Sequence, residues 1–200
     1  MGCVASLLNF SPCVCVPRQG FRRGKAVELY LGYAVASLLG LSAVLLGILI
    51  PGGPVENRDF SHISPMTLGI FNIFLTVLGI GSLVLIYFAF VGSKIAVIAA
   101  ALCGISYFLV YALDLVGIFP VSPDKMPRAL FWIEVAGLIL SIPLTLLSLI
   151  YLFMPNAGEN VSWFSSETTL LILVAVIVLG VGIVIFATKS AMKRSPNKAN

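Results

Sequence analysis

The chain has 200 residues, of which 60% are hydrophobic and 10% are charged, with a formal net charge of +4 and a mean hydropathy of +1.09. In a typical soluble domain about a quarter of the residues are charged, so this composition excludes a water-soluble fold. The sequence contains no nucleotide-binding loop, metal-ligand cluster or nucleophile triad, and we expect no cofactor and no metal site. Because most basic residues lie in the two tails, the net charge indicates attraction to lipid headgroups rather than nucleic-acid binding.

Five continuous apolar runs follow one another along the chain. A helix needs about 20 apolar residues to cross ~30 Å of hydrocarbon, whereas strands of a membrane barrel alternate over ~10 residues. We therefore predict an all-α, polytopic transmembrane bundle in residues 27–188, between an apolar and basic N-terminal segment (1–26) and a basic tail (189–200). The predicted spans are residues 27–50, 67–91, 95–118, 129–154 and 169–187.

The flanks of the spans leave the orientation open. Arg18, Arg22, Arg23 and Lys25 precede the first span, and the positive-inside rule therefore predicts a cytoplasmic N-terminus. The basic tail predicts the same side for the C-terminus, which an odd number of crossings cannot satisfy. First-helix flanks usually dominate, so we favour the N-terminal cluster.

The N-terminal segment and the turns carry further signals. Met1–Ser6 fits the myristoylation pattern, with Cys3 placed for a second acyl chain, although a protein with five spans gains little anchoring from a lipid. Whether Gly2 and Cys3 are lipidated therefore stays open. Ser64 and Pro65 predict a capped start for the second helix. The short turn after that helix predicts that the second and third helices are antiparallel neighbours.

Two ionisable residues, Asp114 and Glu134, fall inside predicted spans. Such residues are costly in lipid and usually face a bundle interior or a wet cavity. Counted at ~1.5 Å per residue from one membrane face, Asp114 lies about 7 Å deep, Glu134 about 9 Å and Asn72 about 10 Å. We expect these three side chains to converge, with Tyr111 on the same helix stripe as Asp114.

Two interpretations of this polar site remain open. The carboxylate pair could bind a cation, a proton or a basic solute, because two close carboxylates cannot both ionise freely. Alternatively, Arg128 or Lys125 neutralises the carboxylates, or both remain hydrated near the interface. We expect the loop that contains His62 and the loop before Arg128 to cover the site. The candidate site residues are Asp114, Glu134, Asn72, Tyr111, His62 and Arg128.

Two short motifs carry a family resemblance that covers roughly Phe60–Ile139. The string Asp114–Pro120 closes one helix, and Ser61–Ser64 followed by Leu68–Asn72 opens an earlier one. Together they resemble the damage-regulated autophagy modulator superfamily and its prokaryotic relatives of unknown function. That resemblance implies a small polytopic membrane protein without enzymatic activity. The chain departs from the family in having five predicted spans rather than about six, and Lys125–Pro127 replaces a histidine often found there.

The sequence therefore predicts a small, multi-pass integral membrane protein with a non-enzymatic structural or modulatory role. The lipid bilayer is its expected surrounding, and a second copy or another membrane protein is a possible partner. The alternative is a carrier or channel subunit, linked to a cation or proton, that uses the intramembrane carboxylate pair. An intramembrane enzyme is disfavoured because no His-Asp or Ser-His pair lies within the spans. The ligand, the compartment and the oligomeric state stay open.

Overall fold

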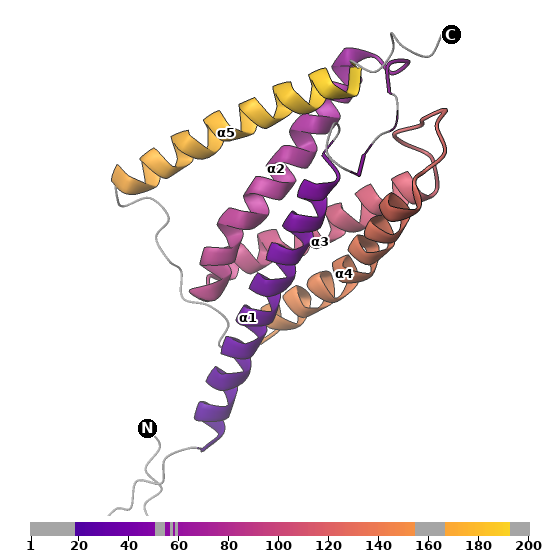
Figure 1. The fold of residues 1–200 in the computed structure, drawn as a ribbon. Helices are drawn as coiled ribbons and strands as arrows, with labels where there is room; N and C mark the ends of the chain where they lie inside the picture. Colours follow the sequence, from indigo (N-terminus) through magenta and orange to yellow (C-terminus); the bar gives the residue numbers. More distant parts are fainter. Residues whose placement is uncertain (1–18, 51–54, 57, 59, 155–166, 193–200) are drawn as a thin grey trace, which may run out of the picture.

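The structure is a computed structural model that describes residues 19–50, 55–56, 58, 60–154 and 167–192. In that part of the chain every regular element is a helix and there is no strand, as predicted. In Figure 1 the last helix of the chain leans away from the others, which pack together. The helices are α1 (Gln19–Ile48), α2 (Pro65–Phe90), α3 (Lys94–Leu115), α4 (Arg128–Leu152) and α5 (Glu167–Met192).

Local chemistry sets the ends of α2. The Ser64 hydroxyl accepts a hydrogen bond from the backbone N–H of Thr67 at 3.2 Å, and Pro65 occupies the first turn. This is the predicted cap. After α2, Gly92 adopts a φ of 80°, which a side chain would disfavour, and Lys94 begins α3 at once. The tight turn confirms that α2 and α3 are antiparallel neighbours.

Helices α1 to α4 form one bundle. The most extensive packing is between α3 and α4, followed by α1 against α2 and α1 against α4. The Tyr107 hydroxyl donates a hydrogen bond to Ser82 Oγ at 3.0 Å, and this bond ties α3 to α2 across the core. The other buried apolar residues at the centre of the bundle include Val35, Leu39, Leu78, Leu85, Ala96, Ala100 and Leu144.

Helix α5 lies at the edge of the bundle. Among the described helices, its only neighbour is α2. The Asn72 amide donates a hydrogen bond to Thr188 Oγ1 at 3.1 Å, and Ala191 packs with Phe60 and Leu68. Several large apolar side chains of α5 are exposed, as expected for a helix at the periphery of a membrane bundle. The exposed set includes Val178, Leu179, Val181, Ile185 and Phe186.

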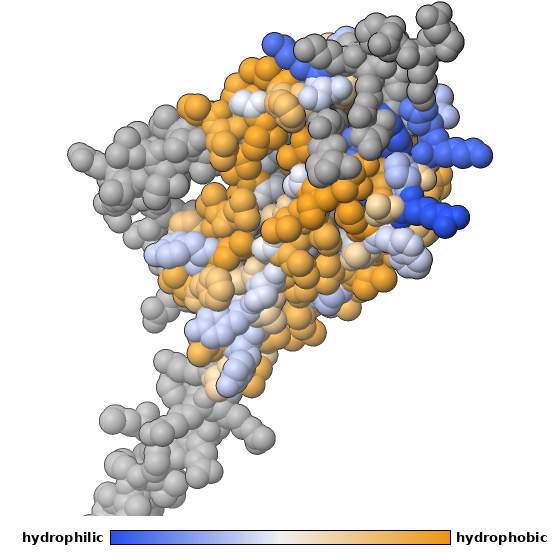
Figure 2. All heavy atoms as spheres, viewed as in Figure 1, coloured by the Kyte–Doolittle hydropathy of each residue, from blue (hydrophilic) through white to orange (hydrophobic). Residues whose placement is uncertain are grey.

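The face of the bundle shown in Figure 2 is mostly apolar (orange atoms), and exposed large apolar side chains occur on each of the helices α1 to α5. Among the described residues, four helices are long and apolar enough to cross a membrane, and the described apolar part of α5, Val178–Ala191, is shorter. An apolar surface of this extent matches a lipid surrounding rather than water. The predicted helical membrane bundle is confirmed, and the first four predicted spans agree with the helices to within a few residues.

Two loops share one end of the bundle. Loop one (residues 49–64) joins α1 to α2, and loop three (residues 116–127) joins α3 to α4. The last turn of α5, with Lys189, lies at this same end, because Ala191 packs against Phe60 of loop one. The start of α1 lies at the opposite end (Figure 1). Basic residues therefore occur at both ends of the bundle. The positive-inside rule thus gives opposite orientations for the two ends in the fold, as it does in the sequence. The candidate lipidation residues Gly2 and Cys3 lie outside the described residues.

Candidate functional site

The two predicted carboxylates lie at the end of the bundle that loops one and three cover. Asp114 occupies the last turn of α3, and its side chain is 12% exposed. Glu134 lies on the second turn of α4 and is fully buried. Because α3 and α4 pack along each other, both acidic groups face the same interior region. Both carboxylates lie within 4 Å of the same guanidinium group, which confirms the prediction that Asp114 and Glu134 converge.

That cation is Arg58 of loop one. Its Nη1 and Nη2 donate to the two carboxylate oxygens of Asp114 at 2.7 Å each. This is a bidentate fork, the strongest arrangement available to an arginine and a carboxylate. Nη2 also lies 3.7 Å from Oε1 of Glu134. Arg58 therefore joins loop one to α3 directly and approaches α4.

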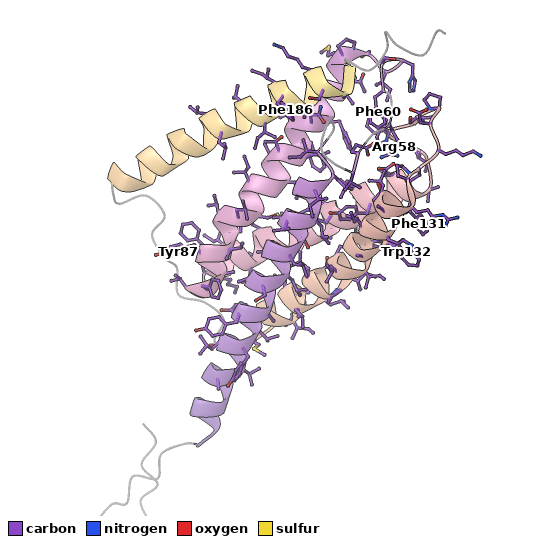
Figure 3. The ribbon with its side chains drawn as sticks, viewed as in Figure 1. Arg58, Phe60, Tyr87, Phe131, Trp132 and Phe186 are labelled. Atoms are coloured by element: carbon purple, nitrogen blue, oxygen red, sulfur yellow. The ribbon has the colours of Figure 1, made fainter. Side chains whose placement is uncertain are left out.

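Glu56 completes the cluster from within loop one. Its carboxylate accepts hydrogen bonds from Nη2 of Arg58 at 2.6 Å and from Nε at 3.0 Å and 3.2 Å. It also accepts the backbone N–H of Arg58 at 3.0 Å. The ring of Phe60 lies 5.3 Å below the guanidinium carbon, and Figure 3 shows Arg58 and Phe60 side by side at this end of the bundle. Loop one thus folds around its own arginine.

The charge of Arg58 is secured by these neighbours. Burial lowers the pKa of the guanidinium, but the hydrogen bonds and charges of Asp114 and Glu56 outweigh it and raise the pKa above its ordinary value. A group whose pKa is raised by folding stabilises the fold at every pH below its unfolded pKa. The contribution of Arg58 is therefore fully present at neutral pH, and only strongly alkaline solution would remove it.

The cluster contains more carboxylates than cations. Glu56, Asp114 and Glu134 together surround the single guanidinium of Arg58. Both carboxylate oxygens of Glu134 are buried without a hydrogen-bond partner among the described residues. A buried unpaired polar group is costly, so Glu134 is the least satisfied member of the cluster.

Asn72 and Tyr111 line a small cavity beside Arg58 and Asp114, with a volume of about 40 Å³. The amide of Asn72 is held by Thr188 of α5. The Tyr111 ring stacks on Tyr107, and its buried hydroxyl has no hydrogen-bond partner among the described residues. One water needs about 10–15 Å³ of such volume, so the cavity has room for a few waters. The structure therefore brings Asn72, Tyr111 and Asp114 together, as predicted.

The prediction was wrong for the other two candidates. Arg128 and His62 are both exposed, and so is Lys125, the other base that could have neutralised the carboxylates. Arg128 is the first residue of α4. His62 lies in the turn that precedes the Ser64 cap. Loop one does cover the site, but it does so through Arg58 and not through His62.

Sequence reasoning missed Arg58, which is the base of the cluster, and Glu56, which pairs with it. The depth of a residue was estimated from the rise per residue of a helix. This estimate does not apply to loop residues, so it could not place Glu56 or Arg58. The available signal was the charge pattern of loop one, where two acidic residues, Glu56 and Asp59, flank Arg58 between apolar stretches. In the described part of the chain, no group of three His, Cys, Asp or Glu side chains could hold a metal ion. Arg58 occupies the centre of the acidic cluster.

Comparison with known proteins identifies a family for this chain. A family model described as "Domain of unknown function (DUF8051)" matches residues 31–163, which is well over half of the chain. The chain belongs to this family. The match contains most of α1 and all of α2, α3 and α4, including Asp114 and Glu134, and it ends before α5 begins. No curated protein and no solved structure matches the chain significantly. The resemblance to the damage-regulated autophagy modulator superfamily therefore stays a prediction.

Proposed function

We propose that this membrane protein has a non-enzymatic, structural or modulatory role, in which Arg58 fastens loop one across the end of the α3–α4 pair. The observation that carries the proposal is the bidentate contact between Arg58 and Asp114. A buried contact of this geometry fixes where two groups lie relative to each other. Loop one and α3 are 56 residues apart in sequence at this point, so the contact holds together distant parts of the chain.

The state of the carboxylates supports this role over transport. A cation-linked carrier needs carboxylates that are free to take up and release their ion, whereas Asp114 is already paired with a buried arginine. The adjoining cavity of about 40 Å³ has room for waters but not for an organic solute, since ligand pockets usually measure about 300–1,000 Å³. The geometry therefore favours a closed end over a solute pathway.

The same groups support a role without catalysis. Among the described residues, every side chain that hydrogen-bonds to Arg58 is a carboxylate. A nucleophile would need an activating base within hydrogen-bond reach. The Tyr111 hydroxyl, whose residue lines the same cavity as Arg58 and Asp114, has no hydrogen-bond partner in the described part of the chain. The cluster is arranged to satisfy its own charges.

One observation favours the alternative of a proton- or cation-linked protein. Glu134 holds two buried carboxylate oxygens without hydrogen-bond partners in the described structure, and intramembrane carboxylates of this kind mark ion pathways in many transporters. The proposal treats Glu134 instead as a positioning group that faces Arg58. The two roles predict different results when the charge of Glu134 is removed: loss of stability for a positioning group, and loss of ion flux for a pathway residue.

Purified protein in vesicles that contain a pH-sensitive dye separates the two roles. We expect no proton flux above that of empty vesicles for the unmodified protein, and we expect the Asp114→Asn variant to unfold at a lower temperature. The exposed Lys125→Gln serves as the control for removal of a charge outside the cluster. Proton flux that disappears in Glu134→Gln, while that variant keeps its unfolding temperature, would contradict the structural role and establish the alternative.

A further inference from the structure

An apolar groove opens between α2 and α5, away from the charged cluster. Its volume is about 490 Å³, and its walls include Ile73, Val77 and Gly81 of α2 and Val181 and Ile185 of α5. The two helices come close at Gly180, where an added Cβ would lie 3.5 Å from the Ile80 side chain. The groove therefore lies beside the place where the two helices come into contact.

The groove extends toward α1. A second cavity of about 160 Å³ shares Thr76 and Ile80 with the first, and it continues along α1 at Ala43 and Leu46. The Thr76 hydroxyl donates a hydrogen bond to the carbonyl of Asn72 at 2.7 Å. This donor is therefore satisfied within α2. Asn72 also borders the second cavity, and its amide donates to Thr188. The rest of the wall is mainly apolar.

The position of the groove selects the kind of molecule that fills it. The wall residues of α2 lie in the middle of the candidate span Pro65–Phe90, where the surrounding medium is hydrocarbon. A helix with its side chains is about 10–12 Å wide and rises ~5.4 Å per turn, so 490 Å³ would hold only about one turn of a helix from another protein. A lipid acyl chain is thin enough to lie along the groove.

Charge at one end of the groove selects the headgroup. Lys189 is exposed and follows Ile185 by one turn of α5, at the end of the bundle where loop one lies. The sequence places three further basic residues, Lys193, Arg194 and Lys198, after it. Basic residues next to a bilayer attract anionic headgroups by about 1 kcal/mol each. A lipid in the groove would thus meet positive charge at its headgroup.

We propose that the α2–α5 groove is a binding site for an anionic phospholipid, with an acyl chain between Val77 and Val181 and the phosphate near Lys189. This proposal is independent of the role of Arg58, because none of its residues contacts the ion cluster. It also assigns a use to α5, the helix that lies outside the family match.

The test uses the full-length protein in vesicles that contain a phosphatidylglycerol with a photoactivatable group in mid-chain. Peptides are then mapped by mass spectrometry. We expect labelling of residues 73–81 and 178–185 to exceed labelling of the outward face of α3, at Leu102 and Leu109, by at least several-fold. The Gly81→Leu variant should lose most of that labelling because a side chain there enters the groove.

Gly69→Leu is the matched control. Gly69 and Gly81 both lie on α2 and are half-buried, a Cβ added to either meets nothing within 4 Å, and only Gly81 borders the groove. A phosphatidylcholine that carries the same photoactivatable chain should label the groove several-fold less than phosphatidylglycerol does. Lys189→Gln should reduce that difference several-fold, because the phosphate loses its partner on α5.

Three outcomes would overturn the proposal. Even labelling of α2 and the outward face of α3 would show ordinary contact with the bilayer. Equal labelling by the two lipids would rule out a site for an anionic headgroup. A disulfide between the Val181→Cys positions of two copies, with no lipid label in the groove, would show that a second copy covers it.

Discussion

The end of the bundle under loop one and the interface between α2 and α5 are held by different forces. At the first, Arg58 makes charge-assisted hydrogen bonds to two carboxylates while nearly buried. At the second, one neutral hydrogen bond, from Asn72 to Thr188, accompanies apolar contact. In a bilayer, apolar contact between helices competes with equally apolar lipid. Polar contacts therefore decide which part of this protein is rigidly placed.

The difference predicts two levels of stability within one chain. Loop one, α3 and α4 should separate only when the bundle unfolds, because separation leaves buried charges unpaired. Helix α5 should detach at a much lower free-energy cost, because few groups lose a partner. Local opening at low cost is the property of elements with few buried contacts.

The largest expected effect comes from removing the cation. Arg58→Ala leaves Asp114, Glu56 and Glu134 without their shared base, and breaking a buried ion pair in this way costs about 3–5 kcal/mol. Thermal unfolding of the protein in detergent measures the loss. The exposed Arg128→Ala is the control and should change stability by no more than about 0.5 kcal/mol. Equal losses in the two variants would mean that the Arg58 cluster does not hold the bundle together.

A smaller effect is expected where α3 and α4 pack most closely. A Cβ added to Gly137 would meet the ring of Tyr111, which is fully buried. Overpacking of this kind costs about 1–3 kcal/mol, so Gly137→Ala should lower the unfolding temperature. Gly69→Ala, where a Cβ meets nothing within 4 Å, should be neutral or stabilising. If Gly137→Ala behaves like Gly69→Ala, the α3–α4 contact is looser than described.

The smallest effect concerns α5. Asn72→Ala removes the hydrogen bond to Thr188, and such bonds between membrane helices contribute about 0.6 kcal/mol on average. Global unfolding should therefore change little, whereas a cysteine placed at the buried Ala187 of α5 should react faster with a maleimide. A cysteine at the buried Ser148 of α4 is the control and should react at an unchanged rate. Faster reaction at both positions would show that α5 is part of the same cooperative unit as α1 to α4.

The fold could be predicted from the sequence because one physical quantity controls it. The length of each apolar run fixes the number and limits of the helices, and capping residues such as Ser64 sharpen those limits. The least predictable helix was α5, whose run is long enough for a span but whose described apolar part is shorter. Run length alone does not tell how a helix packs, because packing depends on side chains of other helices.

The site could be predicted only where helix geometry applies. Asp114 and Asn72 were placed at one level by rise per residue, and they do line one cavity. One of the two interpretations of the site gave the neutralising base to Arg128 or Lys125, whereas the base in the structure is Arg58, far from Glu134 in sequence. A loop has no fixed rise, so the depth of Arg58 depends on how loop one folds back. That path is set by Glu56 and Phe60, which contact the arginine from the same loop.

The measurement that tests the central claim most directly is a double-mutant cycle between Arg58 and Asp114. The free energy of unfolding is measured for the unmodified protein, Arg58→Ala, Asp114→Asn and the double variant. If Arg58 fastens loop one to α3 through this contact, the double variant should be less destabilised than the sum of the single variants by at least ~1.5 kcal/mol, within the range for residues in contact. Additive losses, with a coupling of no more than about 0.3–0.5 kcal/mol, would show that the two residues act separately and would contradict the account.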